Sequence, residues 1–424
     1  MPPDPGAGAE SRIPWLERFP ASRSAALARL CEFVERAPNY AAQRNHVLPG
    51  HPNVSRLSAA IRHRLITERE VIEAMLRRHP FARVEKFVQE VLWRTYWKSW
   101  LAARPGVWRD WRRDTAALKD KLDPSVAATA AVAKSGRAGS PIMNLFAREL
   151  IETGYLHNHA RMWWAGWWVH HLRLPWQLGA EHFYQHLLDA DPASNTLSWR
   201  WVAGLQTPGK TYLAREANLR KFCAPELIAR AGGIGLDPAD PAPPGAPAAP
   251  PEPSLPPSLR TAPGRPCSAG CHERCALLLH DEDMSPETSG ARDLRPALII
   301  QLGPPVHGSG PRAAWLERAR ADAAERAAAH FRAAVRRCNS AGQVFPICRE
   351  RGIVTLVTLQ PDVGPLADAL AQLETDAEAE GIRIECIRRQ WDQAFLPLAK
   401  RGFFSFWMPL RERLRREGLG AIPA

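Results

Sequence analysis

Along the first 230 residues, apolar positions recur at three- and four-residue intervals, the pattern of amphipathic helices. The first predicted helix runs from Ser24 to near Pro38, with Leu27, Leu30, Phe33 and Val34 on its apolar face. Two helices are predicted over 67–103, the second from Val84 to Leu101, and one basic helix over 210–230. This half of the chain is therefore predicted to be all-helical.

The segment 154–201 concentrates aromatic and polar residues as no other part of the chain does. It holds seven tryptophans, and Trp163, Trp164, Trp167 and Trp168 recur at helical intervals, which predicts one largely buried helix. The helical pattern breaks at Pro192, beside Asp189, Asp191, Ser194 and Asn195. Polar groups in so aromatic a frame need partners, and a large flat ligand with polar edges would supply them.

The second half of the chain has a different rhythm. A Pro- and Ala-rich stretch at 237–266 predicts an extended spacer. After it, short apolar runs at 276–279, 297–302, 353–359 and 382–387 alternate with helical stretches at 312–338 and 364–380, which favours a parallel sheet. No G-x-G-x-x-G follows a predicted strand, so the sequence does not indicate a dinucleotide site there.

We therefore expect a multidomain chain. Its predicted parts are a tail (1–23), an all-helical domain (24–233), a Pro/Ala-rich linker (234–266) and a smaller α/β domain of unknown role (267–424). Cys267, Cys271 and Cys275 follow the linker, but their C-x3-C-x3-C spacing matches neither a zinc ribbon nor a zinc finger, so no metal is predicted.

Charge changes the picture of the first half. The net charge is +12, and residues 1–230 hold 33 Lys and Arg against 21 Asp and Glu, which is the entire excess. This balance favours a polyanionic partner such as DNA, although an Arg-rich soluble surface is the alternative. Trp108 and Trp111 stand among arginines, which suits a nucleic-acid surface or, equally, a solvated helix. With no apolar run long enough for a membrane and no secretory signal, we expect a cytoplasmic monomer.

The segment 154–201 resembles the flavin-binding core of the cryptochrome/photolyase family. In that family a run like G-W-x-H-N-x-x-R-M precedes D-x-D-x-x-x-N-x-x-x-W-x-W. The matching positions here are Gly154, His157, Asn158, Arg161, Met162, Asp189, Asp191, Asn195, Trp199 and Trp201. Tyr155 replaces the first tryptophan, and Thr196-Leu197 stands where the family has two glycines.

The resemblance implies an all-helical domain that binds FAD. Asn195 matches the asparagine facing the reactive flavin nitrogen, and Asp189 would pair with Arg161. The family's phosphate-lining loop matches Ser55-Arg56-Leu57-Ser58, with Val54 in place of a threonine. The cofactor-binding residues implied in this way are Tyr40, Ser55, Leu57, Ser58, Arg94, Asn158, Arg161, Asp189, Asp191 and Asn195.

The resemblance also implies an electron path and a substrate. Trp199 and Trp176 match the flavin-proximal and middle tryptophans of the family's chain; the surface-exposed third would be Trp111 or, nearly as well, Trp108. The positions associated with cyclobutane-dimer binding are matched by Glu90, Trp93, Asn158, Met162 and Trp201. The implied activity is a deoxyribodipyrimidine photo-lyase, a carbon–carbon lyase in which blue light drives an electron from reduced flavin to a pyrimidine dimer in DNA.

Two alternatives stay open. The first is a cryptochrome-like photoreceptor that signals through its C-terminal domain; Met162 and Trp201 speak against it, and the unusual domain order speaks for it. The second is a DNA-binding protein without flavin, which leaves the flavin contacts unexplained. Because the predicted flavin domain starts near residue 24, we do not expect the family's N-terminal antenna domain here, and the C-terminal α/β domain is a candidate for it in permuted order.

Overall fold

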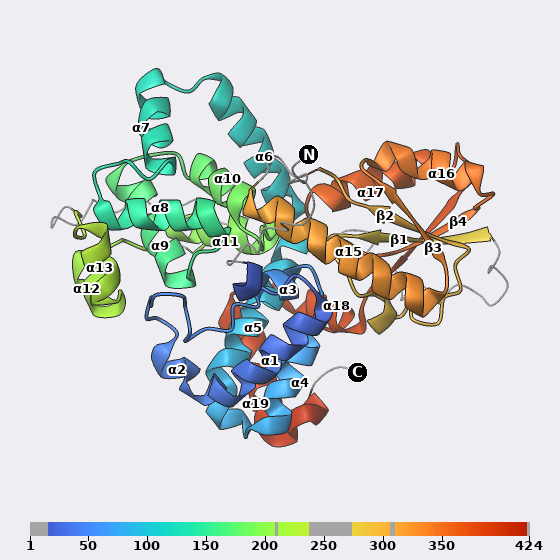
Figure 1. Cartoon of the computed structure of the whole chain (residues 1–424), viewed down its shortest axis with the longest axis horizontal. Helices are drawn as coiled ribbons and strands as arrows, with labels where there is room; N and C mark the ends of the chain where they lie inside the picture. Colours follow the sequence, from blue (N-terminus) through green and yellow to red (C-terminus); the bar gives the residue numbers. More distant parts are fainter. Residues whose placement is uncertain (1–15, 208–210, 237–273, 306–309, 422–424) are drawn as a thin grey trace, which may run out of the picture.

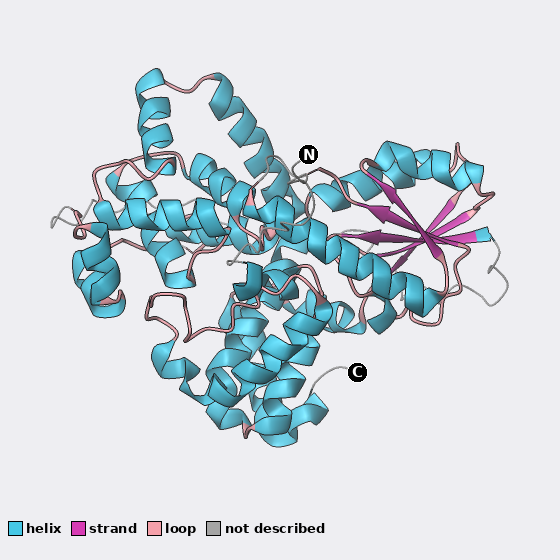
Figure 2. Cartoon of the chain, in the orientation of Figure 1, coloured by secondary structure: helices cyan, strands magenta, loops and turns pink. Residues whose placement is uncertain are grey.

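The computed structural model describes residues 16–207, 211–236, 274–305 and 310–421, and places a helical unit beside an α/β unit (Figure 1). Residues 237–266 of the predicted linker, together with Cys267 and Cys271, lie outside the described residues. Its first residues are described, and Ile234 and Leu236 are buried against the helical unit, so the spacer cannot begin at 234. Colouring by secondary structure separates the two units, since all five strands gather in one of them (Figure 2). Within the described ranges no helix has both the length and the apolar character to cross a bilayer.

The helical unit follows the predicted periodicity. Its helices are α1 (Arg23–Arg36), α2 (Tyr40–Gln43), α3 (Ser58–Arg62), α4 (Glu68–Arg78), α5 (Phe81–Ala102), α6 (Pro105–Asp120), α7 (Pro124–Lys134), α8 (Pro141–Thr153), α9 (Asn158–Gly166), α10 (Trp176–His186), α11 (Pro192–Val202), α12 (Glu216–Phe222) and α13 (Pro225–Ala231). Local chemistry sets several of their starts. Ser22 caps α1, and Thr67 with Glu70 forms a capping box at α4.

The aromatic segment folds around α9. That helix continues into one π-helical turn at Trp167–His171, and all four tryptophans predicted to be buried are buried. Pro192 does not break a helix: it is the first residue of α11, and the Asp191 carboxylate caps that helix by accepting from two backbone N–H groups. Proline is tolerated there because the first helical N–H has no partner within the helix.

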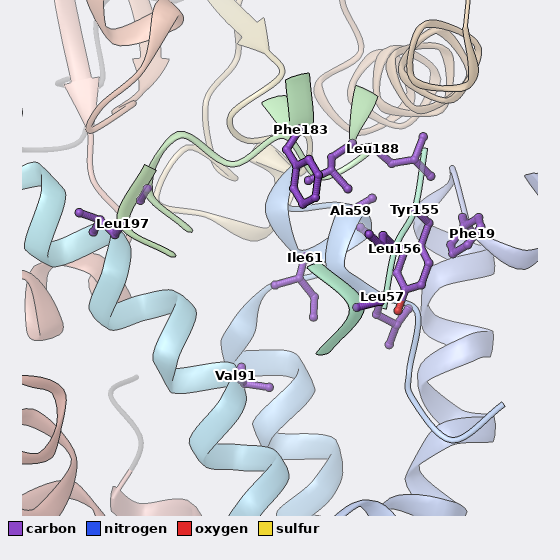
Figure 3. Packing of buried hydrophobic residues seen from close by; sticks show 14 of the residues in the cluster. Phe19, Leu57, Ala59, Ile61, Val91, Tyr155, Leu156, Phe183, Leu188 and Leu197 are labelled. Atoms are coloured by element: carbon purple, nitrogen blue, oxygen red, sulfur yellow. The ribbon is translucent and has the colours of Figure 1, made fainter. Parts of the chain in front are cut away.

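Three local predictions were wrong. Residues 210–230 do not form one helix but contain α12 and α13, since the helix ends before Cys223 and Pro225 opens the next. Trp108 and Trp111 are 2 % exposed, because α6 turns both indoles inward and turns the neighbouring arginines outward. Phe19, placed in a loose tail, is buried against Tyr155, with ring centroids 4.7 Å apart (Figure 3).

The α/β unit contains a five-stranded parallel sheet with the order β3-β2-β1-β4-β5. Its strands are β1 (Cys275–His280), β2 (Leu298–Leu302), β3 (Ala334–Cys338), β4 (Thr355–Leu359) and β5 (Arg383–Ile387). Helix α15 (Pro311–Phe331) packs with one face of the sheet, and α16 (Val344–Glu350) and α17 (Pro365–Asp376) with the other. Strands β1, β2 and β4 are buried apolar runs, as predicted.

Strand β3 was not predicted, since its residues were assigned to a helix over 312–338. The helix ends at Phe331, and Ala334–Cys338 pairs in register with β2 at one edge of the sheet. Most of its positions are exposed, so the apolar run that identified the other strands is missing.

The chain returns to the helical unit after the sheet. Helices α18 (Gln390–Phe395) and α19 (Phe403–Glu417), the red ribbons of Figure 1, lie against the blue α5. The Trp391 indole donates to the Thr95 hydroxyl over 3.1 Å, and the Tyr96 hydroxyl donates to the Arg401 carbonyl over 2.8 Å. Helices that follow the sheet in sequence are therefore part of the helical core, an arrangement that the predicted domain order did not include.

Buried charges join the two units. Arg64, from the helical unit, donates to Asp283 over 3.3 Å and to Asp392 over 2.6 Å, and Arg389 pairs with Asp283 over 2.5 Å. We call Arg64, Asp283, Arg389 and Asp392 the junction cluster. Close by, Arg62 donates to both carboxylate oxygens of Glu282 over 2.7 and 2.5 Å. The α/β unit is thereby fixed to the segment that connects α3 and α4.

Candidate functional site

Two arginine–aspartate pairs lie at the start of α11. Arg94 of α5 donates from Nη1 to Asp191 over 2.7 Å, while the other oxygen of Asp191 caps α11. Burial alone would raise the pKa of Asp191, but the charges of Arg94 and Arg62 outweigh it and lower that pKa. The resemblance implied that Asp191 binds the cofactor; in the structure the protein itself supplies three hydrogen bonds to its carboxylate.

The predicted pair between Arg161 and Asp189 is present. Arg161 Nη1 lies 3.1 and 3.3 Å from the two carboxylate oxygens, and its Nε donates to the Leu156 carbonyl over 2.8 Å. Burial works to raise the pKa of Asp189, yet the charges of Arg161 and Arg94 and a hydrogen bond from Ser58 lower it. Ser58, from the predicted phosphate loop, is thereby connected to the acidic segment.

A short loop at residues 44 and 45 connects two of the helices that carry predicted substrate residues. Glu90 of α5 forms ion pairs with Arg44 over 3.0 Å and with Lys86 over 2.9 Å. The Asn45 carbonyl bonds to Nδ1 of His159 in α9 over 2.7 Å, so one short loop holds α5 and α9.

Two further contacts extend this arrangement to α11. His159 Nε2 lies 3.1 Å from the Tyr212 hydroxyl, and the Tyr212 ring lies 5.9 Å from that of Trp201. Asn158 and Met162 face the same side of α9, where the amide nitrogen is 3.9 Å from the thioether sulfur. Glu90 and Trp201 are thus the two ends of one chain of contacts that runs through His159, and Asn158 and Met162 lie on the same helix as His159.

Trp93, the fifth, has a partner that the sequence did not indicate. Its half-buried indole stacks on Phe403 of α19, with ring centroids 3.6 Å apart and planes 10° from parallel. Tyr96 and Trp97 approach the same indole at 5.7 and 5.2 Å.

Buried polar atoms without a hydrogen-bond partner gather in the loop before α3 and next to it. Among the described residues they include His46 Nδ1, His51 Nδ1, Asn53 Oδ1, Arg56 Nε and His157 Nε2. An unsatisfied buried polar group costs about 1–3 kcal/mol, so a ligand with several donors and acceptors would remove a large penalty here. Burial and the neighbouring His51 lower the pKa of His157 to about 3, which keeps this imidazole neutral.

This donor and acceptor set fits FAD, whose diphosphate, ribityl hydroxyls and ring edges need such groups. Ser55 and Ser58 lie in the same loop, and Leu57 between them is fully buried. The Tyr40 ring packs edge-on against Phe87 at 5.0 Å, and burial raises the pKa of its hydroxyl. All the implied cofactor residues therefore lie on α2, the 55–58 loop, α5, α9 or the start of α11.

The predicted electron-path residues differ in burial: Trp199 and Asn195 are buried, whereas Trp176 is half-buried. Trp199 is buried, lies 5.1 Å edge-on from Phe183, and passes so close to Gly179 that a Cβ at that position would collide with its ring. Asn195 donates its side-chain amide to the Ala180 carbonyl over 2.8 Å, which holds α11 to α10 at this point. Trp176 is the half-buried first residue of α10.

The third tryptophan was predicted to be exposed, and neither candidate is. The Trp111 indole donates to the carbonyl of Gln177, the residue after Trp176, over 3.3 Å. Trp108 and Trp111 are both buried where α6 meets α10, and their ring centroids are 5.2 Å apart. Neither indole therefore lies at the surface, where the third tryptophan was predicted.

Sequence reasoning missed three residues of this site. Arg44 stands beside Tyr40, where an arginine near a predicted carboxylate could have suggested the pair with Glu90. His157 belongs to the quoted motif, but the sequence does not show that its Nε2 is buried without a hydrogen-bond partner or that its ring lies 5.8 Å from that of His51. Nothing in the sequence indicated Phe403, because its contact with Trp93 joins two segments that lie far apart in the chain.

Residues 87–224 match the family model described as the FAD binding domain of DNA photolyase. The chain is 29 % identical over 200 residues to the deoxyribodipyrimidine photo-lyase of Escherichia coli, covering 46 % of this chain and 42 % of that protein. It is 36 % identical over 200 residues to a protein of that name from Thermus thermophilus, covering 44 % of each. The chain thus spans less than half the length of these relatives.

A solved bacterial class III photolyase from Agrobacterium tumefaciens is 22 % identical, with a TM-score of 0.40, over 57 % of this chain and 56 % of that one. The matched family domain includes α9, α10, α11 and most of α5. The cofactor of this domain is FAD.

Proposed function

We propose that this chain, which belongs to the photolyase/cryptochrome family through residues 87–224, is a light-driven DNA repair enzyme for cyclobutane pyrimidine dimers. The observation that supports the proposal is that the loop at residues 44 and 45 connects Glu90 of α5 to α9, the helix that carries Asn158, Met162 and the arginine of one arginine–aspartate pair. Core packing alone would not select a carboxylate, an amide and a thioether for one surface.

FAD would be held by Arg94, Arg161, Asp189 and the serines of the 55–58 loop. When it is bound and reduced, FAD supplies an excited-state electron donor for the dimer, and the protein supplies binding and orientation. Glu90, fixed by Arg44 and Lys86, presents a carboxylate as an acceptor for the N–H groups of a flipped-out base. Trp93 and Trp201 offer rings on which the pyrimidines stack.

The charge of the chain supports the DNA partner. Residues 1–230 carry the whole net charge of +12, and this part contains nearly all the residues of the site. Lysines and arginines that neutralise phosphates release counterions, so binding would weaken steeply as the salt concentration rises.

The test is illumination of the reduced protein with a thymine-dimer oligonucleotide, followed by chromatography of the strand. Repaired thymine is expected in the light and not in the dark. Trp201→Ala should weaken binding to dimer-containing DNA by roughly ten- to a hundredfold, since stacking is worth about 1–3 kcal/mol per base. Undamaged duplex of the same sequence serves as the control for nonspecific binding.

A cryptochrome-like photoreceptor is the second candidate, and one contact favours it. Arg62 acts on the charge of Asp191 and is bound to Glu282 of the α/β unit, so a change at the site would reach the other unit directly. Absence of repair by protein that demonstrably contains reduced FAD would favour this function over the first.

A further inference from the structure

We propose that Phe403 is a positioning residue for substrate binding: by stacking on Trp93 it holds that indole in the orientation that a flipped pyrimidine needs. The inference rests on the function proposed above and adds a residue from outside the matched family domain. It gives the C-terminal helix α19 a part in a site whose other residues lie between 40 and 212.

The geometry of the stack is the first support. The two rings are 10° from parallel with centroids 3.6 Å apart, so Phe403 covers one face of the indole. Tyr96 meets the indole edge-on, and Trp97 is tilted by 40°. The indole remains half-buried, which leaves part of it accessible to a ligand.

The anchoring of α19 is the second support. Phe403 itself is 3 % exposed and stacks in turn on Trp407, with ring planes 11° apart. The Arg401 carbonyl just before the helix accepts from the Tyr96 hydroxyl, and Arg411, two turns further on, forms an ion pair with Glu85. Because α19 is fixed to α5 on both sides of Phe403, the phenyl ring is a rigid wall and not a mobile side chain.

A fixed indole matters for binding because ordering a side chain on contact costs free energy. An aromatic ring that is already oriented loses less conformational entropy when a base stacks on it. Glu90, one helical turn from Trp93, is fixed in the same way by Arg44 and Lys86. The two substrate residues of α5 are thus oriented independently, one by charge and one by stacking.

Phe406 provides a matched control. It lies on the same helix, is also 3 % exposed, and packs against Tyr96 and Phe395 with ring centroids 5.7 Å away in each case. Within the described part of the chain it has no ring contact with Trp93. Phe406→Leu therefore removes the same atoms as Phe403→Leu from the same interface, without removing the stack.

The experiment compares the affinity of full-length variants, loaded with FAD, for thymine-dimer duplex and for undamaged duplex of equal sequence, by fluorescence anisotropy. Phe403→Leu should lower the preference for dimer DNA about three- to tenfold, the range that an aromatic pair is worth beyond its buried area. FAD content should match wild type, Phe403→Tyr should restore the preference, and Phe406→Leu should keep it. If Phe403→Leu fails to retain FAD, Phe403→Met replaces it.

Three results would overturn the inference. A wild-type preference in Phe403→Leu means that the stack does not orient Trp93 for binding. Equal losses in Phe403→Leu and Phe406→Leu mean that only the docking of α19 matters. Wild-type protein without any preference for dimer DNA would overturn the proposed function itself, and this inference with it. That failure is distinguishable from failure of this inference alone, because it is seen in wild-type protein before any substitution is made.

Discussion

Arginine–aspartate pairs occur at two places in this molecule, and they differ in how far they are satisfied. At the site, Arg94 and Arg161 pair with Asp191 and Asp189, and the arginine side chains keep 15 % and 23 % of their exposure. In the junction cluster, the side chains of Arg64 and Arg389 keep 5 % and 9 %. The aspartates are buried in both places, with lowered pKa values at Asp189, Asp191 and Asp283.

The difference separates a structural contact from a binding site. Arg389 directs all three of its nitrogens to Asp283, Ser285 and Thr288, so no donor is left for a ligand. Within the described residues, Arg94 donates only from Nη1, and its other N–H groups stay available. The saturated Arg389 thus serves to hold two units together, although the buried Nε of Arg64 in the same cluster has no hydrogen-bond partner among the described residues. Arg94, which in the same part of the chain keeps free N–H groups beside unpartnered polar atoms, is the better candidate for contact with a polar cofactor.

The largest effect is expected in the junction cluster. Asp283→Ala leaves Arg389 and Arg64 buried beside a missing charge, and removing one member of such a pair costs about 3–5 kcal/mol of unfolding free energy. Urea unfolding followed by circular dichroism measures it. Asp114→Ala, which breaks an exposed pair with Arg113, is the control and should change stability by less than about 1 kcal/mol. Equal losses would show that the junction is not structural.

The next effect is a pH dependence centred on His63, which bonds to the Asp281 carbonyl over 2.6 Å at the same junction. Burial, with the charge of Arg62, lowers the pKa of His63 to about 4, whereas an unfolded histidine titrates near about 6.5. Between these values only the unfolded chain takes up the proton, so stability falls as the pH drops from about 6.5 to about 4, by up to about 3 kcal/mol.

Unfolding free energies measured at pH 7 and pH 5 test this contribution. His63→Gln should flatten the difference between the two pH values, while replacement of the exposed His330 by glutamine should leave it as in wild type. The lowered pKa of Asp283 affects stability in a different pH range. The stabilisation from this carboxylate is present above pH about 3.9, the pKa of an unfolded aspartate, and is lost only below that pH. An unchanged slope in His63→Gln would assign the acid sensitivity to other groups.

The smallest effect on stability, and the largest on cofactor retention, is expected at Asp189. Asp189→Asn keeps the shape of the side chain but removes the charge that holds Arg161. Because Arg161 is partly solvated, the variant should lose only about 1–2 kcal/mol of unfolding free energy. The flavin absorbance per protein should fall severalfold and recover when excess FAD is added. A variant that retains FAD fully but unfolds as easily as Asp283→Ala would remove the distinction between the two kinds of pair.

Local patterns in the chain were enough to place the elements whose burial is regular. Helices α1, α4 and α5 and strands β1, β2, β4 and β5 lie where periodicity and apolar runs placed them. For these elements the local pattern contains the physical cause, which is burial of one face. The pair between Arg161 and Asp189, which the structure contains, was implied by the resemblance to the photolyase/cryptochrome motif and not by any local pattern.

Contacts between distant segments determine the rest. Strand β3 reads Ala-Val-Arg-Arg-Cys and is a strand only because β2 offers it an edge to pair with. Trp111 is buried because α10 lies over it, and Phe403 stacks on Trp93 because the chain returns to α5 after completing the sheet. These contacts join segments far apart in the chain, and no local periodicity records which distant surface will cover a side chain.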